Sequence, residues 1–214
     1  MKGLILKDLL NLRKTIRTSL IFGIAYSIFF ASFNTSLIVG ILALMFTMQA
    51  ITTFSYDEHA KWDIYGLSLP ITRKQLVLSK YVVSFTLMLS GMVLSFVLTS
   101  ILTTFHGSFN FTEIISGLFG FSISMILMLI TVIPLMYKFG VERGRLMIIG
   151  VFAIPTGIIL IIVKMFNQLN IPLPSSEQIE SWLPPAPYVI ILILAIVTYI
   201  SYQASIKVVC KKEY

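Results

Sequence analysis

The sequence is short of charge. Only 12% of its 214 residues are aspartate, glutamate, lysine or arginine, whereas 57% are hydrophobic, and the mean hydropathy is +0.93. Soluble domains usually carry about 25% charged residues, so this composition excludes an ordinary water-soluble protein. It is typical of a polytopic membrane protein whose helices face lipid or one another.

Cysteine and catalytic motifs are also scarce. The single cysteine, Cys210, can form no disulfide within the chain. The two histidines, His59 and His106, fall on opposite sides of the membrane in the topology that the charges predict, so they cannot share a metal ion. The sequence contains no G-x-x-x-x-G-K-[ST] phosphate loop, no G-x-S-x-G motif and no H-E-x-x-H motif. We therefore expect no catalytic residue, metal or cofactor in this chain.

Six apolar segments are long enough, or nearly so, to cross a bilayer as helices of about 20 residues. None carries a charge near its centre, because Glu113, Lys138 and Lys164 lie at segment ends. This absence disfavours a transporter driven by protons or sodium ions, which usually needs such a group or a broken helix. The segments are Thr18–Phe33, Ser36–Phe54, Tyr81–Phe105, Glu113–Tyr137, Leu146–Phe166 and Pro187–Ile206.

The lysines and arginines fall almost entirely on one side of these segments. Fifteen of the sixteen lie before the first segment, after the second, after the fourth or after the sixth, and only Lys164 lies near the other side. The positive-inside rule then places both termini in the cytosol. The net charge of +7 is spread over loops, so we expect contact with anionic lipid headgroups and no binding of nucleic acid.

Two regions outside the segments have a predicted structure of their own. Residues 1–17 form a basic amphipathic helix suited to lie along the inner membrane surface. This helix either only anchors the first span or also contacts a cytosolic partner. Residues 167–186 form the longest external loop, in which Ser175 and Gln178 predict a capping box and a short helix.

The longest polar stretch is the connection between the second and third segments, residues 55–80. On a helix Glu58, Trp62 and Tyr65 share one face, while Asp57 and Lys61 are spaced as a favourable ion pair. Large aromatic side chains on a solvated helix favour a protein partner. The alternative for Trp62 is a residue at the membrane interface with no partner.

A turn is predicted to follow this helix. Gly66 can end the helix in a left-handed conformation, and Pro70 forces extended backbone at Leu69. Thr72 and Gln75 then form a predicted capping box at the start of the next helix. The connection is therefore predicted as helix, sharp turn and helix, able to pass movement from a cytosolic partner to the third span.

Small residues recur at every fourth position on two spans. This spacing lets helix backbones approach closely, so we interpret the stripes first as packing faces and second as a lining for a transport pathway. Two prolines predict bends in spans four and five. The stripes are Gly91, Ser95, Thr99 and Thr103 on the third span and Ser116, Gly120 and Ser124 on the fourth, and the prolines are Pro134 and Pro155.

The string K-W-D-x-Y-x-L-S-L-P-I-T-R-K-Q, at Lys61 to Gln75, resembles the corresponding loop of small bacterial permeases of the ABC transporter type-2 superfamily. The layout of a basic N-terminal helix, six spans and a basic tail is similar as well. The resemblance implies a permease subunit of an ATP-driven exporter in the bacterial cytoplasmic membrane. It also implies a second permease copy or a homologous permease, and separate cytosolic ATPase subunits that bind ATP and Mg²⁺.

With this resemblance we expect an all-α fold with one permease domain over residues 1–214, in which the connection 55–80 is the coupling element. A pathway without buried charge suits an amphipathic or hydrophobic cargo, such as an antimicrobial peptide, a drug or a lipid. The alternatives are a non-transporting scaffold or immunity protein and, with no paired catalytic groups to support it, an intramembrane enzyme. The predicted ATPase-coupling residues are Asp57, Glu58, Lys61, Trp62, Tyr65, Leu69, Pro70 and Arg73.

Overall fold

The structure, a computed structural model, describes residues 1–30, 35–62, 65–66, 70–105, 107, 109–168 and 186–211. These residues are almost entirely helical and include no strand, which confirms the predicted all-α class. The helices are α1 (Lys2–Phe30), α2 (Thr35–His59), α4 (Arg73–Phe105), α5 (Phe111–Gln168) and α7 (Ala186–Lys211).

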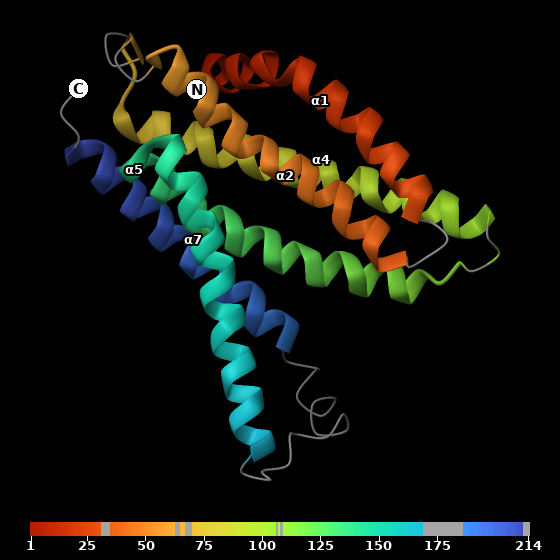
Figure 1. Ribbon diagram of the computed structural model, residues 1–214. Coiled ribbons are helices and arrows are strands. Elements are labelled where there is room, and N and C mark those ends of the chain that lie inside the picture. The colour runs from red at the N-terminus through yellow and green to blue at the C-terminus, as the bar shows by residue number, and fades with distance from the viewer. Residues whose placement is uncertain are drawn as a thin grey trace.

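The helices form one elongated bundle (Figure 1). α2 lies at its centre and contacts α1, α4 and α5. α5 consists of two parts, one before and one after Gly140. α7 runs beside the first part toward the end of the molecule where α1 begins, and the second part turns away from the bundle (Figure 1). The beginning of α1 and the end of α7 therefore lie at the same end, which we call the charged end.

Within the described residues, four helical stretches are long and apolar enough to cross a membrane. They coincide with the second, third, fourth and sixth predicted segments. The first and fifth predicted segments lie in α1 and in the second part of α5 and are not among the four, so six spans stay a prediction. The four stretches are Ile38–His59, Arg73–Phe105, Phe111–Gly144 and Tyr188–Lys211.

α1 is one continuous helix, so no helix end separates the predicted surface helix 1–17 from the first span. Leu4, Asp8 and Leu12 are buried along one of its faces, four residues apart. Leu12 packs in an apolar cluster with Val83 and Leu87 of α4. The N-terminal residues are thus part of the bundle on this face, because apolar side chains at helical spacing bury together.

The small residues predicted on the third span lie between α4 and α2. The Ser95 hydroxyl donates a hydrogen bond to the Val39 carbonyl at 2.7 Å, and both Ser95 and Thr99 are buried. A Cβ atom added at Gly91 would lie 2.5 Å from Phe46 Cβ. These contacts let the backbones of α2 and α4 approach closely, as small residues do between membrane helices.

We expect Gly91→Ala to destabilise the protein by about 1–3 kcal/mol, because the new methyl group meets the root of the Phe46 side chain and overpacks the contact. The measurement is reversible unfolding in detergent. Gly120→Ala is the matched control, since a Cβ at Gly120 meets nothing within 4 Å and alanine is the better helix former. Equal stability of Gly91→Ala and the wild type would contradict the close packing of α4 on α2.

The small residues predicted on the fourth span have a different place. Ser116, Gly120 and Ser124 are exposed on α5. The Ser116 hydroxyl bonds only to the Glu113 carbonyl of its own helix. This stripe therefore does not pack against another described helix of the chain.

α5 is broken at one residue. Gly140 has φ 79° and ψ 178°, and the helix on either side is regular. This combination of angles is almost restricted to glycine. The backbone therefore departs from helical geometry at Gly140, six residues after Pro134, where the sequence predicts a bend.

Candidate functional site

Four charged side chains from three helices form a closed group at the charged end, which we call the charge cluster: Lys7, Asp8, Asp57 and Lys80. The Lys80 ammonium lies 3.0 Å from Asp8 Oδ2 and 2.6 Å from Asp57 Oδ2. The Lys7 ammonium lies 2.6 Å from Asp57 Oδ1 and 3.1 Å from Asp8 Oδ1. Each cation therefore bridges both carboxylates, and the charges balance.

The charge cluster is buried. The side chains of Asp8, Lys80 and Asp57 are 2%, 4% and 9% exposed, and only Lys7, at 19%, has appreciable contact with water. Removing an unpaired charge from water costs several kcal/mol, so buried charges are retained only in well-paired groups. Lys80 also donates to the Thr53 carbonyl at 3.4 Å. Its partners Asp8, Asp57 and Thr53 come from α1 and α2, so the cluster ties α4 to both helices.

Trp62 lies directly beside the charge cluster. The Lys7 ammonium sits 4.1 Å from the centroid of the Trp62 ring, which is the geometry of a cation–π contact. The Trp62 and Tyr65 rings lie 5.3 Å apart, and Tyr65 is 58% exposed. The chain thus presents an exposed aromatic residue whose neighbour, Trp62, is held by a lysine of α1.

The first part of the connection 55–80 differs from its prediction. α2 ends at His59 and Lys61 adopts a positive φ of 48°, whereas Gly66 does not. The predicted left-handed end at Gly66 is therefore wrong, and the break falls five residues earlier. The predicted pair between Asp57 and Lys61 is replaced by the pairs of Asp57 with Lys7 and Lys80.

The second part of the connection follows its prediction. The Thr72 N–H donates to Gln75 Oε1 and the Gln75 N–H donates to Thr72 Oγ1, both at 3.2 Å. This reciprocal pair confirms the predicted capping box at the start of α4. Arg73 Nη1 donates to the carbonyls of Val209 and Cys210, at 3.1 and 2.7 Å. It satisfies two of the free carbonyls at the end of α7.

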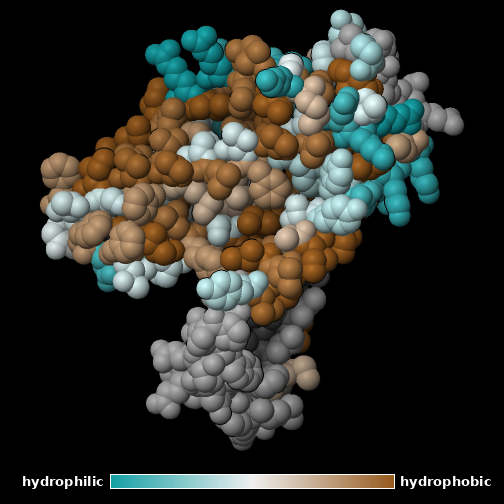
Figure 2. Space-filling view, turned by 180° about the vertical axis from the view of Figure 1, so that it is seen from behind, coloured by the Kyte–Doolittle hydropathy of each residue, from teal (hydrophilic) through white to brown (hydrophobic). Residues whose placement is uncertain are grey.

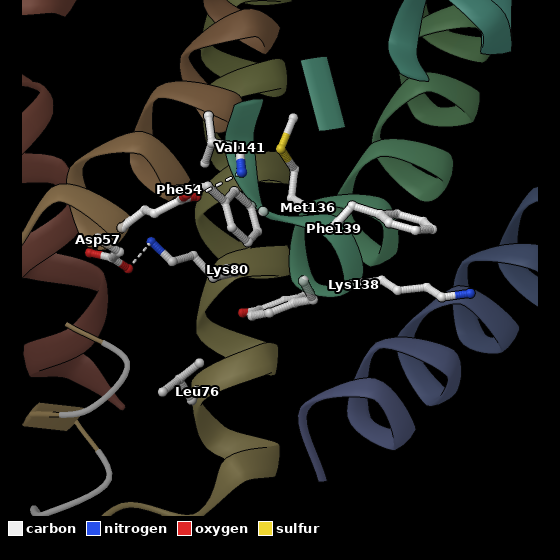
Figure 3. Close-up of a pocket in the computed structure, with 11 residues that line it drawn as sticks. Phe54, Asp57, Leu76, Lys80, Met136, Lys138, Phe139 and Val141 are labelled. Atoms are coloured by element: carbon white, nitrogen blue, oxygen red, sulfur yellow. Dashed lines mark hydrogen bonds and ion pairs between the residues drawn. The ribbon is translucent and has the colours of Figure 1, made fainter. Parts of the chain in front are cut away.

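A cavity of about 260 Å³ adjoins the charge cluster (Figure 3). Glu58 Oε2 accepts a hydrogen bond from the Val141 N–H at 2.7 Å. An acidic side chain is favourable there, because Val141 begins the second part of α5 and the N-terminal end of a helix carries a partial positive charge. The lining residues are Phe54, Asp57, Glu58, Leu76, Lys80, Met136, Tyr137, Lys138, Phe139, Gly140 and Val141.

The described members of the eight predicted coupling residues make different contacts. Asp57 points into the bundle, Glu58 binds the start of a helix, and Arg73 binds the end of α7. Leu69 lies outside the described residues, as does the predicted external helix at Ser175. The exposed members are Glu58, Lys61, Tyr65 and Pro70, and Trp62 and Arg73 are partly exposed.

Asp8 is the functional candidate that sequence reasoning missed. Its spacing from Leu4 and Leu12 places it on the buried stripe of α1, where an acidic residue requires a partner. The position of Asp8 on this apolar face was the feature of the sequence that could have identified it. Its partner Lys80 lies 72 residues further along the chain, in the connection 55–80, which the sequence predicts to be polar. Within the described ranges, no group of three or more histidine, cysteine, aspartate or glutamate side chains lies close enough to hold a metal ion.

Comparison with known families gives one match. A family model described as ABC-2 family transporter protein matches residues 3–209. Searches of the curated proteins and of the solved structures find no match. The family match covers nearly the whole chain, including the charge cluster and all but the outermost residues of the described helices. The chain is therefore a membrane-embedded permease component that belongs to the ABC-2 family of transporter proteins.

Proposed function

We propose that the chain is the membrane-spanning subunit of an ATP-driven exporter and that its ATPase docks on the connection 55–80. The observation that carries this proposal is the pair of Trp62 and Tyr65, which the structure places beside the charge cluster with Tyr65 exposed. Aromatic anchors of this kind dominate the binding energy of many interfaces. Membership of the family supports an ATPase partner, since a permease of an ABC transporter works with one.

The proposed topology has six spans with both termini in the cytosol of a bacterial cell. The bias of fifteen of sixteen lysines and arginines to one side supports it. Figure 2 shows a largely hydrophobic surface along the bundle and most of the hydrophilic residues at the charged end. In this topology the charged end lies at the inner membrane surface, where Lys7 and Trp62 can meet a cytosolic partner.

The docking surface we propose is narrower than the eight residues predicted from the sequence. It consists of Lys61, Trp62, Tyr65 and Pro70, which are wholly or partly exposed. Asp57, Glu58 and Arg73 are left out of it because their side chains bind α1, α4, α5 and α7. ATP and Mg²⁺ would bind to the ATPase subunits, and a second permease copy or a homologue would complete the transporter.

The proposed cargo is amphipathic or hydrophobic. An open groove of about 410 Å³ between α1, α2 and α5 is lined almost entirely by apolar atoms of residues such as Tyr26, Leu44 and Phe121. A second open groove, of about 580 Å³, lies between α4 and α7 and is lined by Phe85 and Tyr199 among others. Apolar walls of this kind favour an acyl chain or an apolar peptide over a small ion.

We expect the double variant Trp62→Ala/Tyr65→Ala to lose about tenfold or more of the ATP hydrolysis that co-purifies with the tagged chain from its own cells, because central aromatic anchors are worth about 2 kcal/mol or more each. Tyr188→Ala is the matched control, since Tyr188 is an exposed tyrosine near the beginning of α7, away from the charged end. Wild-type hydrolysis in the double variant would refute the docking surface. No ATPase activity with the wild-type chain would favour a non-transporting scaffold.

A further inference from the structure

We propose that Lys7, Asp8 and Lys80 are positioning residues for Trp62. The charge cluster fixes the place of Trp62, just beyond the end of α2, relative to α1 and α4. The functional consequence of this inference rests on the proposed function. If an ATPase displaces Trp62, these are the contacts through which it would move the helices. The test of the inference uses the chain alone, so the inference can fail while the docking of an ATPase stands.

The contacts form an unbroken series from the connection into the bundle. The Trp62 ring lies 4.1 Å from the Lys7 ammonium. That ammonium lies 2.6 Å from Asp57, which lies 2.6 Å from Lys80. Lys80 in turn lies 3.0 Å from Asp8. Lys7 therefore joins the aromatic surface to the buried charges, with no gap that a water molecule would have to fill.

The charges make this connection stiff. If α4, or α1 and α4 together, moved away from the end of α2, Lys80 or Asp57 would be left without a partner in a site that is less than one-tenth exposed. A lone buried charge is strongly unfavourable. The end of α2 therefore moves together with α4, by a route that does not depend on the turn predicted before Pro70, and Lys7 links it to α1.

The same end of α2 also reaches α5. Glu58, which follows Asp57 in the chain, accepts the hydrogen bond of the Val141 N–H. Asp57 and Glu58 thus bind different helices: Asp57 pairs with Lys7 of α1 and Lys80 of α4, whereas Glu58 binds α5 beside the break at Gly140. Movement of Trp62 is passed in this way to three other helices.

The test measures how easily acrylamide quenches the fluorescence of Trp62. The chain has two tryptophans, so Trp182→Phe leaves Trp62 as the sole emitter, and the protein is held in lipid nanodiscs. We expect Lys7→Met to raise the quenching constant by about twofold, because it removes the cation that covers the ring. Lys2→Met, at an exposed lysine of the same helix, should leave the constant unchanged, and Lys7→Arg should keep it low.

Substitutions of Asp8 and Lys80, the members of the cluster with opposite charge, should have different effects on the quenching of Trp62. Asp8→Asn leaves two cations for one carboxylate, and Lys7, the more exposed of the two, turns to water and uncovers Trp62. Lys80→Met leaves two carboxylates for Lys7 and holds it in place, so quenching should not rise. The double variant Asp8→Asn/Lys80→Met restores the balance of charge. Its quenching constant should therefore equal that of the protein with the unsubstituted cluster.

A cluster that only stabilises the fold would give a different result. Both single variants would then lower the melting temperature, and the quenching of Trp62 in the folded protein would either stay constant or rise equally in both. Either pattern would overturn the proposal. If Asp8→Asn fails to fold, the comparison of Lys7→Met with the double variant decides, because increased quenching in the double variant is incompatible with positioning by charge balance.

Discussion

Replacing Lys80 with methionine should destabilise the protein by about 3–5 kcal/mol, which is the usual cost of breaking a buried ion pair by removing one partner. Two carboxylates, Asp8 and Asp57, would then share Lys7 alone. Both carboxylates are less than one-tenth exposed, so water can do little to compensate them. The loss arises from the uncompensated charge, because methionine fills nearly the same apolar volume as the stem of lysine.

The measurement is the free energy of unfolding in mixed detergent micelles. Lys74→Met is the matched control, since Lys74 is an exposed lysine on the same helix and exposed charges contribute little to stability. The double variant Asp8→Asn/Lys80→Met should recover much of the loss, because the remaining pair is neutral. Additive losses in the double variant would show that the two side chains act independently, which the distance of 3.0 Å between them does not allow.

The second large effect is expected at the break in α5. Gly140→Ala should cost about 1–3 kcal/mol, because φ 79° with ψ 178° is strained for a residue that has a Cβ atom. The added methyl carbon would also lie 3.3 Å from Glu58 Oε1. It therefore presses on the carboxylate that binds the Val141 N–H, and the two parts of α5 should lose their fixed angle.

The change of angle can be measured as a distance between spin labels on α2 and on the second part of α5, with Cys210 replaced by serine. We expect a broader distance distribution in Gly140→Ala than in the wild type. Gly157→Ala is the control, because a Cβ at Gly157 meets nothing within 4 Å. A distribution of unchanged width in Gly140→Ala would mean that the break does not depend on the conformation of glycine.

Local signals in the sequence predicted the local structure well. The runs of apolar residues predicted an all-helical membrane protein and four stretches that the structure contains. The spacing of Thr72 and Gln75 predicted the capping box, because both partners lie within one helical turn. These features depend on neighbours in the chain, which a single sequence displays.

Features that depend on distant partners were not predicted. Asp57 was paired with Lys61 at helical spacing, yet the structure pairs it with Lys7 and Lys80, which lie on other helices. A charged lysine is buried only where acidic groups pair with it. The sequence alone does not show that Asp8 and Asp57 converge on Lys80. The break at Gly140 was missed for a related reason, since its angle is stabilised by Glu58 from α2.

The separation of the charge cluster along the chain also constrains how the protein is assembled. Lys7, Asp8 and Asp57 emerge from the ribosome before Lys80, which follows Asp8 by 72 residues. Without α4, α1 and α2 therefore carry one carboxylate more than they can neutralise at this position. α4 supplies the missing cation, so a nascent chain that stops before Lys80 retains an unbalanced acid and cannot complete this contact.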